Sequence, residues 1–163
     1  MTPAQIALVE QSYAEVRPIA GLAGKLFYER LFEIAPELAP LFKGDIEEQG
    51  RKLMAVLTTA ISLLRHPDRL QQALEDLGRR HRAYGVDAAH FAPVGEALIW
   101  TLEQGLQDRF TPERREAWLA LYQGVTATML RGLNGAEEMP SHLAARRHPQ
   151  PWWQRLVFFW RRA

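Results

Sequence analysis

Apolar residues recur every three or four positions through the first 133 residues, and this spacing predicts a series of amphipathic helices. Thr2 as N-cap, Pro3 in the first turn and Gln5 in a capping box mark the start of the first helix. The second helix should end before Pro36, because a residue that precedes proline avoids the helical conformation. No alternation typical of strands is present. We therefore expect an all-α chain of about six to eight helices with short connections.

The composition narrows the possible chemistry. The 163 residues suit a single domain. The chain has no cysteine, which excludes disulfides, thiolate zinc sites, iron–sulfur clusters and cysteine nucleophiles. Glycine-rich nucleotide loops, an HExxH zinc motif and a nucleophile-elbow serine are missing, which disfavours nucleotide binding and hydrolysis. No signal-peptide pattern is visible and no apolar run reaches the ~18 residues of a membrane span, so a cytoplasmic location is expected.

His81 is the candidate metal ligand. It follows Leu74 and Leu77 on a predicted helix at positions that place the three side chains on one face. A neutral imidazole is a common metal ligand in proteins. A plainer interpretation is a surface histidine between Arg80 and Arg82.

Several segments, in order and with suitable spacing, resemble the bacterial single-domain globins and the globin domain of flavohaemoglobins. The resemblance covers residues 1–133 and is carried by several segments together rather than by any one of them. These segments are LFYERLF (26–32), APELAPLF (35–42), EQGRKLM (48–54), LGRRHRAYGV (77–86), HFAPVG (90–95) and EAW (116–118).

The resemblance implies a globin fold around haem b, with His81 as the iron ligand. The second ring nitrogen of His81 is then expected to donate to a backbone carbonyl or a side chain, which fixes the tautomer. His90 is the rival ligand, and the resemblance places it at a helix start, away from the iron. The remaining expected contacts on this side of the haem and around its edge are Leu77, Val86, Phe91 and Val94.

The resemblance places Tyr28 and Gln49 on the distal side, where two hydrogen-bond donors would slow O2 release and raise O2 affinity. Without it, Tyr28 is an ordinary core tyrosine and Gln49 a solvated residue at the exposed start of its helix. Further distal contacts are expected from Phe42 against the porphyrin, Leu53 one turn after Gln49, and Lys52 (or Arg51) at a haem propionate.

Two departures from the flavohaemoglobin pattern affect the expected function. A buried tyrosine–glutamate pair supports the proximal histidine in that family, whereas the aligned positions here are Phe91 and Leu133, which cannot relay a proton. This argues against strong peroxidase-like activation. The 30 residues after position 133 are too few for the flavin and nicotinamide domain of that family, so we expect redox turnover to need a separate reductase.

The expected function is reversible O2 binding at pentacoordinate iron, for transport, storage or scavenging, with NO or sulfide as further ligands. NO dioxygenation or a peroxidase-like reaction with an external reductase is the alternative, because the same pocket would serve it. A haem sensor is disfavoured because no output domain is recognisable. A helical bundle without haem would leave the ordered motif series unexplained. A monomer or a homodimer is expected.

The last part of the chain differs from the rest. Residues 134–150 are expected to be a polar linker and residues 151–163 a separate basic, aromatic segment. From Ser141 onward there are five arginines and no acid, whereas residues 1–140 hold 15 basic and 19 acidic residues. Tryptophan and phenylalanine flanked by arginine are typical of an interfacial anchor, which predicts peripheral membrane contact; packing on the globin or on a second subunit is the alternative. The acidic body argues against nucleic acid as a partner.

Overall fold

The computed structural model describes residues 1–42 and 44–134, and all regular structure in these residues is helical. This confirms the expected all-α class. The predicted linker beyond Asn134 and the predicted segment 151–163 lie outside the described residues. The α-helices are α1 (Pro3–Val16), α2 (Ala20–Ile34), α3 (Ile46–Ser62), α4 (Pro67–Ala83), α5 (Phe91–Leu106) and α6 (Pro112–Asn134). Short 3-10 helices connect them at η1 (Arg17–Ile19), η2 (Pro36–Leu41), η3 (Ala88–His90) and η4 (Gln107–Arg109).

Local sequence signals determine several of the helix ends. The predicted capping box is present, with the Gln5 amide N–H donating to Thr2 Oγ1 at 3.2 Å and the Thr2 amide N–H donating to Gln5 Oε1 at 2.9 Å. Helix α2 ends at Ile34, and the backbone of Ala35 leaves the helical region immediately before Pro36. Asp45 caps α3 by accepting the Glu48 amide N–H at 3.3 Å.

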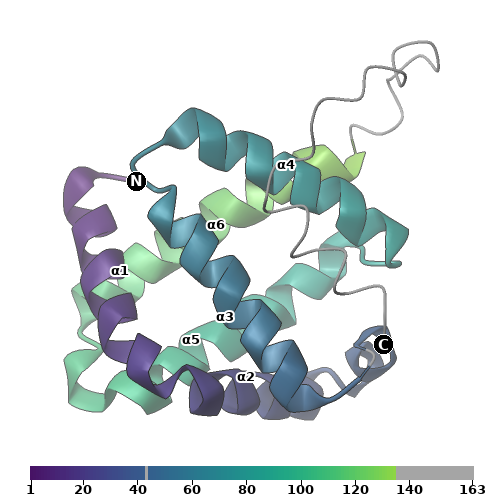
Figure 1. Ribbon diagram of the computed structural model, residues 1–163, viewed down its shortest axis with the longest axis horizontal. Coiled ribbons are helices and arrows are strands. Elements are labelled where there is room, and N and C mark those ends of the chain that lie inside the picture. Colours follow the sequence, from purple (N-terminus) through teal and green to yellow (C-terminus); the bar gives the residue numbers. More distant parts are fainter. Residues whose placement is uncertain (43, 135–163) are drawn as a thin grey trace.

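Helix α3 runs across the middle of the molecule (Figure 1). Figure 1 shows α4 beside the later part of α6 at the top and α2 along the bottom, with α3 running between them. Helix α3 packs on α2, α4 packs on α6, and α1 packs on α6 and α5. Helices α2 and α4 therefore approach the interior from opposite sides.

Glycines allow the two closest helix pairs to approach. A Cβ atom on Gly24 of α2 would lie 2.6 Å from the Gly50 Cα atom of α3. A Cβ atom on Gly78 of α4 would collide with the Met129 carbonyl of α6, and one on Gly132 of α6 with the Glu75 carbonyl of α4. These backbones are therefore in direct contact, which fixes the positions of α3 and α4.

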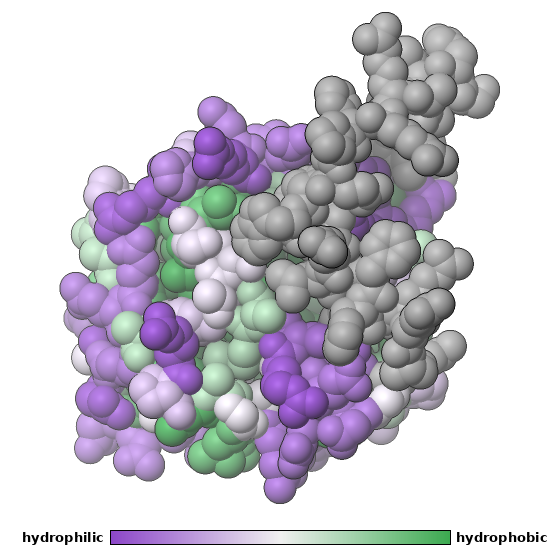
Figure 2. Space-filling view, viewed as in Figure 1, coloured by the Kyte–Doolittle hydropathy of each residue, from purple (hydrophilic) through white to green (hydrophobic). Residues whose placement is uncertain are grey.

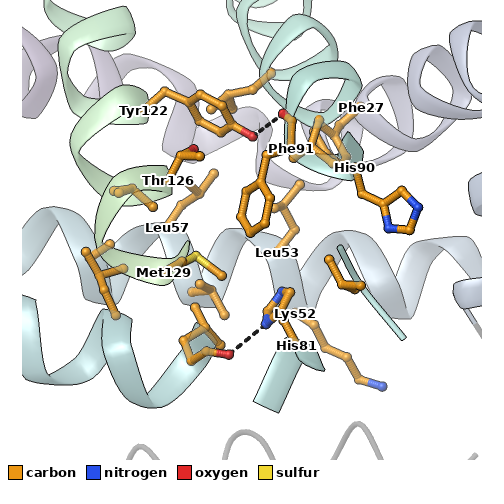
Figure 3. A pocket seen from close by; sticks show the side chains of 18 of the residues that line it. Phe27, Lys52, Leu53, Leu57, His81, His90, Phe91, Tyr122, Thr126 and Met129 are labelled. Atoms are coloured by element: carbon orange, nitrogen blue, oxygen red, sulfur yellow. Dashed lines mark hydrogen bonds between the residues drawn. The ribbon is translucent and has the colours of Figure 1, made fainter. Parts of the chain in front are cut away.

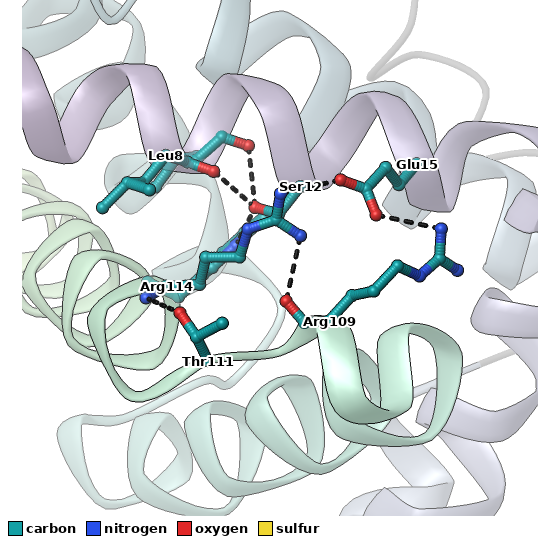
Figure 4. A network of polar contacts seen from close by, with 8 residues as sticks. Leu8, Ser12, Glu15, Arg109, Thr111 and Arg114 are labelled. Atoms are coloured by element: carbon teal, nitrogen blue, oxygen red, sulfur yellow. Dashed lines mark hydrogen bonds and ion pairs between the residues drawn. The ribbon is translucent and has the colours of Figure 1, made fainter.

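A polar network joins α1 to α6 (Figure 4). Trp118 is fully buried, and its Nε1–H donates at 2.8 Å to Ser12 Oγ, which in turn donates to the Leu8 carbonyl at 2.7 Å. Arg114 bridges the Glu15 carboxylate at 2.8 Å and the Arg109 carbonyl at 3.0 Å. The hydrogen bond from Arg114 lowers the pKa of Glu15.

The described surface is mostly polar. Figure 2 shows hydrophilic side chains over much of the visible described surface, with smaller apolar areas among them. None of the described helices has the length and apolar character that crossing a bilayer demands.

Candidate functional site

A large apolar cavity occupies the space between the helices. Its volume is about 790 Å³, and its walls come from α2, η2, α3, α4, α5 and α6. An apolar cavity of about 150 Å³ is enough to hold a benzene molecule, so this one has room for a ligand of several fused rings. Figure 3 shows aliphatic and aromatic side chains around it, among them Leu53, Leu57 and Met129.

His81 projects into the cavity from the last turn of α4, with its ring directed toward Leu53 and Phe91 (Figure 3). Its Nδ1 atom lies 2.9 Å from the Leu77 carbonyl oxygen, one helical turn earlier. A carbonyl only accepts, so Nδ1 carries the proton and Nε2 presents a lone pair. Burial lowers the pKa of His81, which favours the neutral imidazole. The expected backbone acceptor is therefore present, and the tautomer suits a metal ligand.

The wall around His81 is apolar and rigidly held. Leu74, Phe91 and Met129 form a buried cluster, against which Leu77 and Leu133 pack. Phe91 and Leu133, which align with the tyrosine and glutamate of flavohaemoglobins, therefore both belong to an apolar cluster. The close contacts made by Gly78 and Gly132 fix α4 on α6, so the His81 ring is carried on a helix with little freedom to move.

Tyr28 lines the cavity from α2 and is 2% exposed. Its ring packs edge-on against Phe27 at a centroid distance of 5.0 Å and against Phe42 at 5.2 Å. Burial raises the pKa of the Tyr28 phenol, so the hydroxyl stays protonated and can act as a donor. Phe42 lines the cavity as well, and its extended backbone follows η2.

Gln49 is 3% exposed, so the interpretation of this position as exposed and solvated is wrong. The contact of Gly50 with Gly24 presses the first turn of α3 onto α2, which removes Gln49 from solvent. Its neighbours Leu53 and Lys52 line the cavity, whereas Gln49 is not among the lining residues. A distal role for Gln49 stays a prediction.

Cationic side chains from α3 reach the edge of the cavity. Lys52 lines it with its side chain 9% exposed, and its Nζ atom lies 3.0 Å from Glu48 Oε1. Arg51 also lines the cavity. These groups could hold the carboxylates of a ligand whose apolar part fills the interior.

The rival histidine is held away from the interior. His90 accepts the Asp87 amide N–H at Nδ1 (3.2 Å), and its Nε2 lies 3.6 Å from Asp87 Oδ2. Figure 3 shows its ring turned away from His81. Of the two described histidines that line the cavity, His81 is the one directed inward.

The structure brings together nearly all of the predicted site. With Gln49 excepted, every residue expected to contact the cofactor lines the cavity, namely Tyr28, Phe42, Lys52, Leu53, Leu77, His81, Val86, Phe91 and Val94. Sequence reasoning missed Tyr84, Tyr122 and Thr126, which also line it. The Tyr122 hydroxyl donates to the Phe91 carbonyl at 2.6 Å. Tyr84 could have been predicted, because it follows His81 by three residues and residues three apart on a helix are neighbours.

A neutral imidazole that projects into an apolar cavity between helices, with cations at the cavity edge, is typical of proteins that bind haem. The chain belongs to the globin family, whose family model matches residues 25–129. Neuroglobins of Tetraodon nigroviridis and Danio rerio are each 37% identical over 123 residues, which cover 67% of this chain and 77% of each neuroglobin. Family membership implies a haem cofactor and the binding of small gases such as O2.

The fold comparison agrees. The crystal structure of a hexacoordinated heme protein from an anhydrobiotic tardigrade matches with a TM-score of 0.75 at 19% identity, covering 82% of this chain and 95% of that one. The globin part of the expected resemblance is confirmed. Its bacterial and flavohaemoglobin-like part is not supported by these relatives.

Proposed function

We propose that this chain holds haem b through His81 Nε2 and binds O2 reversibly in the part of the cavity beneath Tyr28. The observation that carries the proposal is the hydrogen bond between His81 Nδ1 and the Leu77 carbonyl. It leaves Nε2 unprotonated inside an apolar cavity of suitable size. The bound iron would supply the bond to O2, and the chain's own side chains would hold the ring and exclude water.

Tyr28 would favour O2 over less polar ligands. Tyr28 lies on α2, at the end of the molecule opposite α4, which carries His81. The surrounding phenylalanines remove competing water, so a hydrogen bond from Tyr28 to O2 in this part of the cavity is strengthened. High O2 affinity is expected on this ground.

We propose pentacoordinate iron in the unliganded ferrous protein. Among the described residues that line the cavity, the histidines are His81 and His90, and His90 is bonded to Asp87. Helix α3 itself contains no histidine, so this helix offers no histidine to the distal side. The tardigrade protein is described as a hexacoordinated heme protein, and hexacoordination is the alternative for this chain.

Absorption spectra of the ferric, dithionite-reduced and O2-exposed protein test the proposal. A Soret band, a high-spin ferrous spectrum and a stable O2 complex are expected for the wild type and for His90→Ala. His81→Ala should lose this pattern. A folded wild type that takes up no haem would overturn haem binding, and a low-spin ferrous spectrum would overturn pentacoordination alone.

NO dioxygenation is the second candidate. The cavity lining continues along α3 from Leu53 to Ile61, which offers apolar room for a second small ligand beside O2. In that reaction NO and O2 combine with one electron to give nitrate, and the electron must come from a separate reductase. Nitrate formed per haem, with and without an added flavin reductase, decides between one turnover and sustained catalysis.

A further inference from the structure

The described residues leave part of the cavity wall open to solvent. Several lining residues from the start of α3 and from the chain on either side of it are not buried. Arg51 is exposed, Phe42 is half-buried, and beyond the end of α4 Val86 is half-buried and Tyr84 is 36% exposed. A haem held by His81 would therefore keep one edge of its ring uncovered by these residues.

The chain beyond α6 starts close to this open part of the wall. The Arg82 side chain donates from Nη1 to the Leu133 carbonyl at 3.3 Å, and Arg82 directly follows His81 in the last turn of α4. The end of α6 is thus tied to the end of α4. The 16 residues of the linker 135–150 can span up to about 50 Å, so the segment 151–163 can reach any point of the open wall. Because the segment is tethered, its effective concentration there is high.

The composition of segment 151–163 fits a haem edge. The segment has five large aromatic residues, three arginines and no acid, namely Trp152, Trp153, Phe158, Phe159, Trp160, Arg155, Arg161 and Arg162. Aromatic side chains bury a large apolar area, and arginine pairs with carboxylates through two hydrogen bonds.

The charges favour the loaded cavity over the empty one. The charged residues among the described lining are Glu48, Arg51 and Lys52, which together carry +1. The two carboxylates of a haem would change the sum at this site to −1. The segment carries +3, so it is attracted to the cavity edge only after haem has bound.

We propose that residues 151–163 complete the haem pocket by covering the open edge of the cavity, with the aromatic side chains on the ring edge and the arginines on the haem carboxylates. This inference rests on the proposed function, because it requires haem held by His81. The membrane contact expected for this segment would use the same side chains. A molecule bound to a bilayer through them would therefore leave its haem edge uncovered.

The rate of haem loss tests the proposal. The full-length ferric protein is mixed with excess apomyoglobin in lipid-free buffer, and haem transfer is followed in the Soret band. The variant Trp152→Ser/Trp153→Ser/Trp160→Ser should lose haem at least about tenfold faster than the wild type. Covering about 60 Å² of apolar ring surface is enough for an effect of this size.

A second variant tests the charges separately. Arg155→Gln/Arg161→Gln/Arg162→Gln should also lose haem faster, and its rate should depend less on salt than that of the wild type, since the removed ion pairs are screened by salt. Arg146→Gln/Arg147→Gln is the matched control, because it makes the same chemical change in the linker and leaves segment 151–163 intact. This control should keep the wild-type rate.

Wild-type rates of haem loss in both triple variants overturn the inference. If the same two variants also fail to co-sediment with anionic vesicles, the segment serves membranes alone. Equal acceleration by the linker control overturns the inference too, since positive charge anywhere beyond α6 would then be sufficient. A wild type without a Soret band overturns the proposed function, and this inference with it.

Discussion

Replacing Tyr28 by phenylalanine separates the polar role of this residue from its packing role. The ring would stay in its cage between Phe27 and Phe42, since only the hydroxyl is removed. Tyr28 is 2% exposed, so no water from bulk solvent takes the place of the lost donor. The variant therefore reports on the hydrogen bond to O2 with little change in the shape of the cavity.

The expected effect follows from the strength of that bond. Bound O2 carries partial negative charge, and a hydrogen bond to a charged group contributes about 1.5–3 kcal/mol. A loss of this size corresponds to an O2 dissociation rate that rises about 10- to 150-fold, at 1.4 kcal/mol for each factor of ten. CO is less polar, and its dissociation rate should change much less.

Stopped-flow displacement of O2 by CO measures the rate directly. Tyr122→Phe is the control, because it makes the same chemical change in a cavity-lining residue whose hydroxyl already donates to the Phe91 carbonyl. Its O2 dissociation rate should stay close to that of the wild type. If Tyr28→Phe releases O2 as slowly as the wild type, Tyr28 does not donate to O2 and the assignment of the distal side is wrong.

Three further predictions concern stability and the end of the chain. Gly132→Ala should lower the free energy of unfolding by about 1–3 kcal/mol, since its Cβ atom would collide with the Glu75 carbonyl. The control is Gly124→Ala on the same helix, whose Cβ atom would meet nothing within 4 Å. In denaturant titrations this control should stabilise the protein by roughly 0.5–1 kcal/mol. The pKa of Glu15 is lowered in the folded protein, so the ionised carboxylate adds stability at pH values above its ordinary pKa of 4.5. This contribution disappears as the pH falls through the folded pKa. The Tm difference between the wild type and Glu15→Gln should therefore vanish in acid. Removal of residues 141–163 should reduce co-sedimentation with anionic vesicles, and equal pelleting would contradict a membrane role.

Features that depend on neighbours along the chain could be predicted from the sequence. The capping box at Thr2, the end of α2 before Pro36 and the all-helical class follow from short-range steric and hydrogen-bonding preferences. The acceptor for His81 belongs to the same group, because the Leu77 carbonyl lies one turn earlier on the same helix. The order of motifs was then enough to identify the globin family.

The burial of individual site residues was decided by tertiary packing. Gln49 lies in the first turn of an amphipathic helix and has the polarity of a surface residue. It is nevertheless buried, because the backbones of Gly24 and Gly50 are in contact and bring α3 onto α2. Such a contact joins residues 26 positions apart in the chain, and local periodicity does not encode it. The bond from Tyr122 to the Phe91 carbonyl is hidden for the same reason.

By itself, then, the sequence determined the helices, the globin family and the expectation that one ring nitrogen of His81 bonds to a nearby group of the protein. Only the tertiary structure decided which polar side chains share the cavity, which of them reach water and how tightly α4 is held. Those properties arise where helices distant in sequence meet, and small differences in backbone approach, such as those allowed by Gly78 and Gly132, set them.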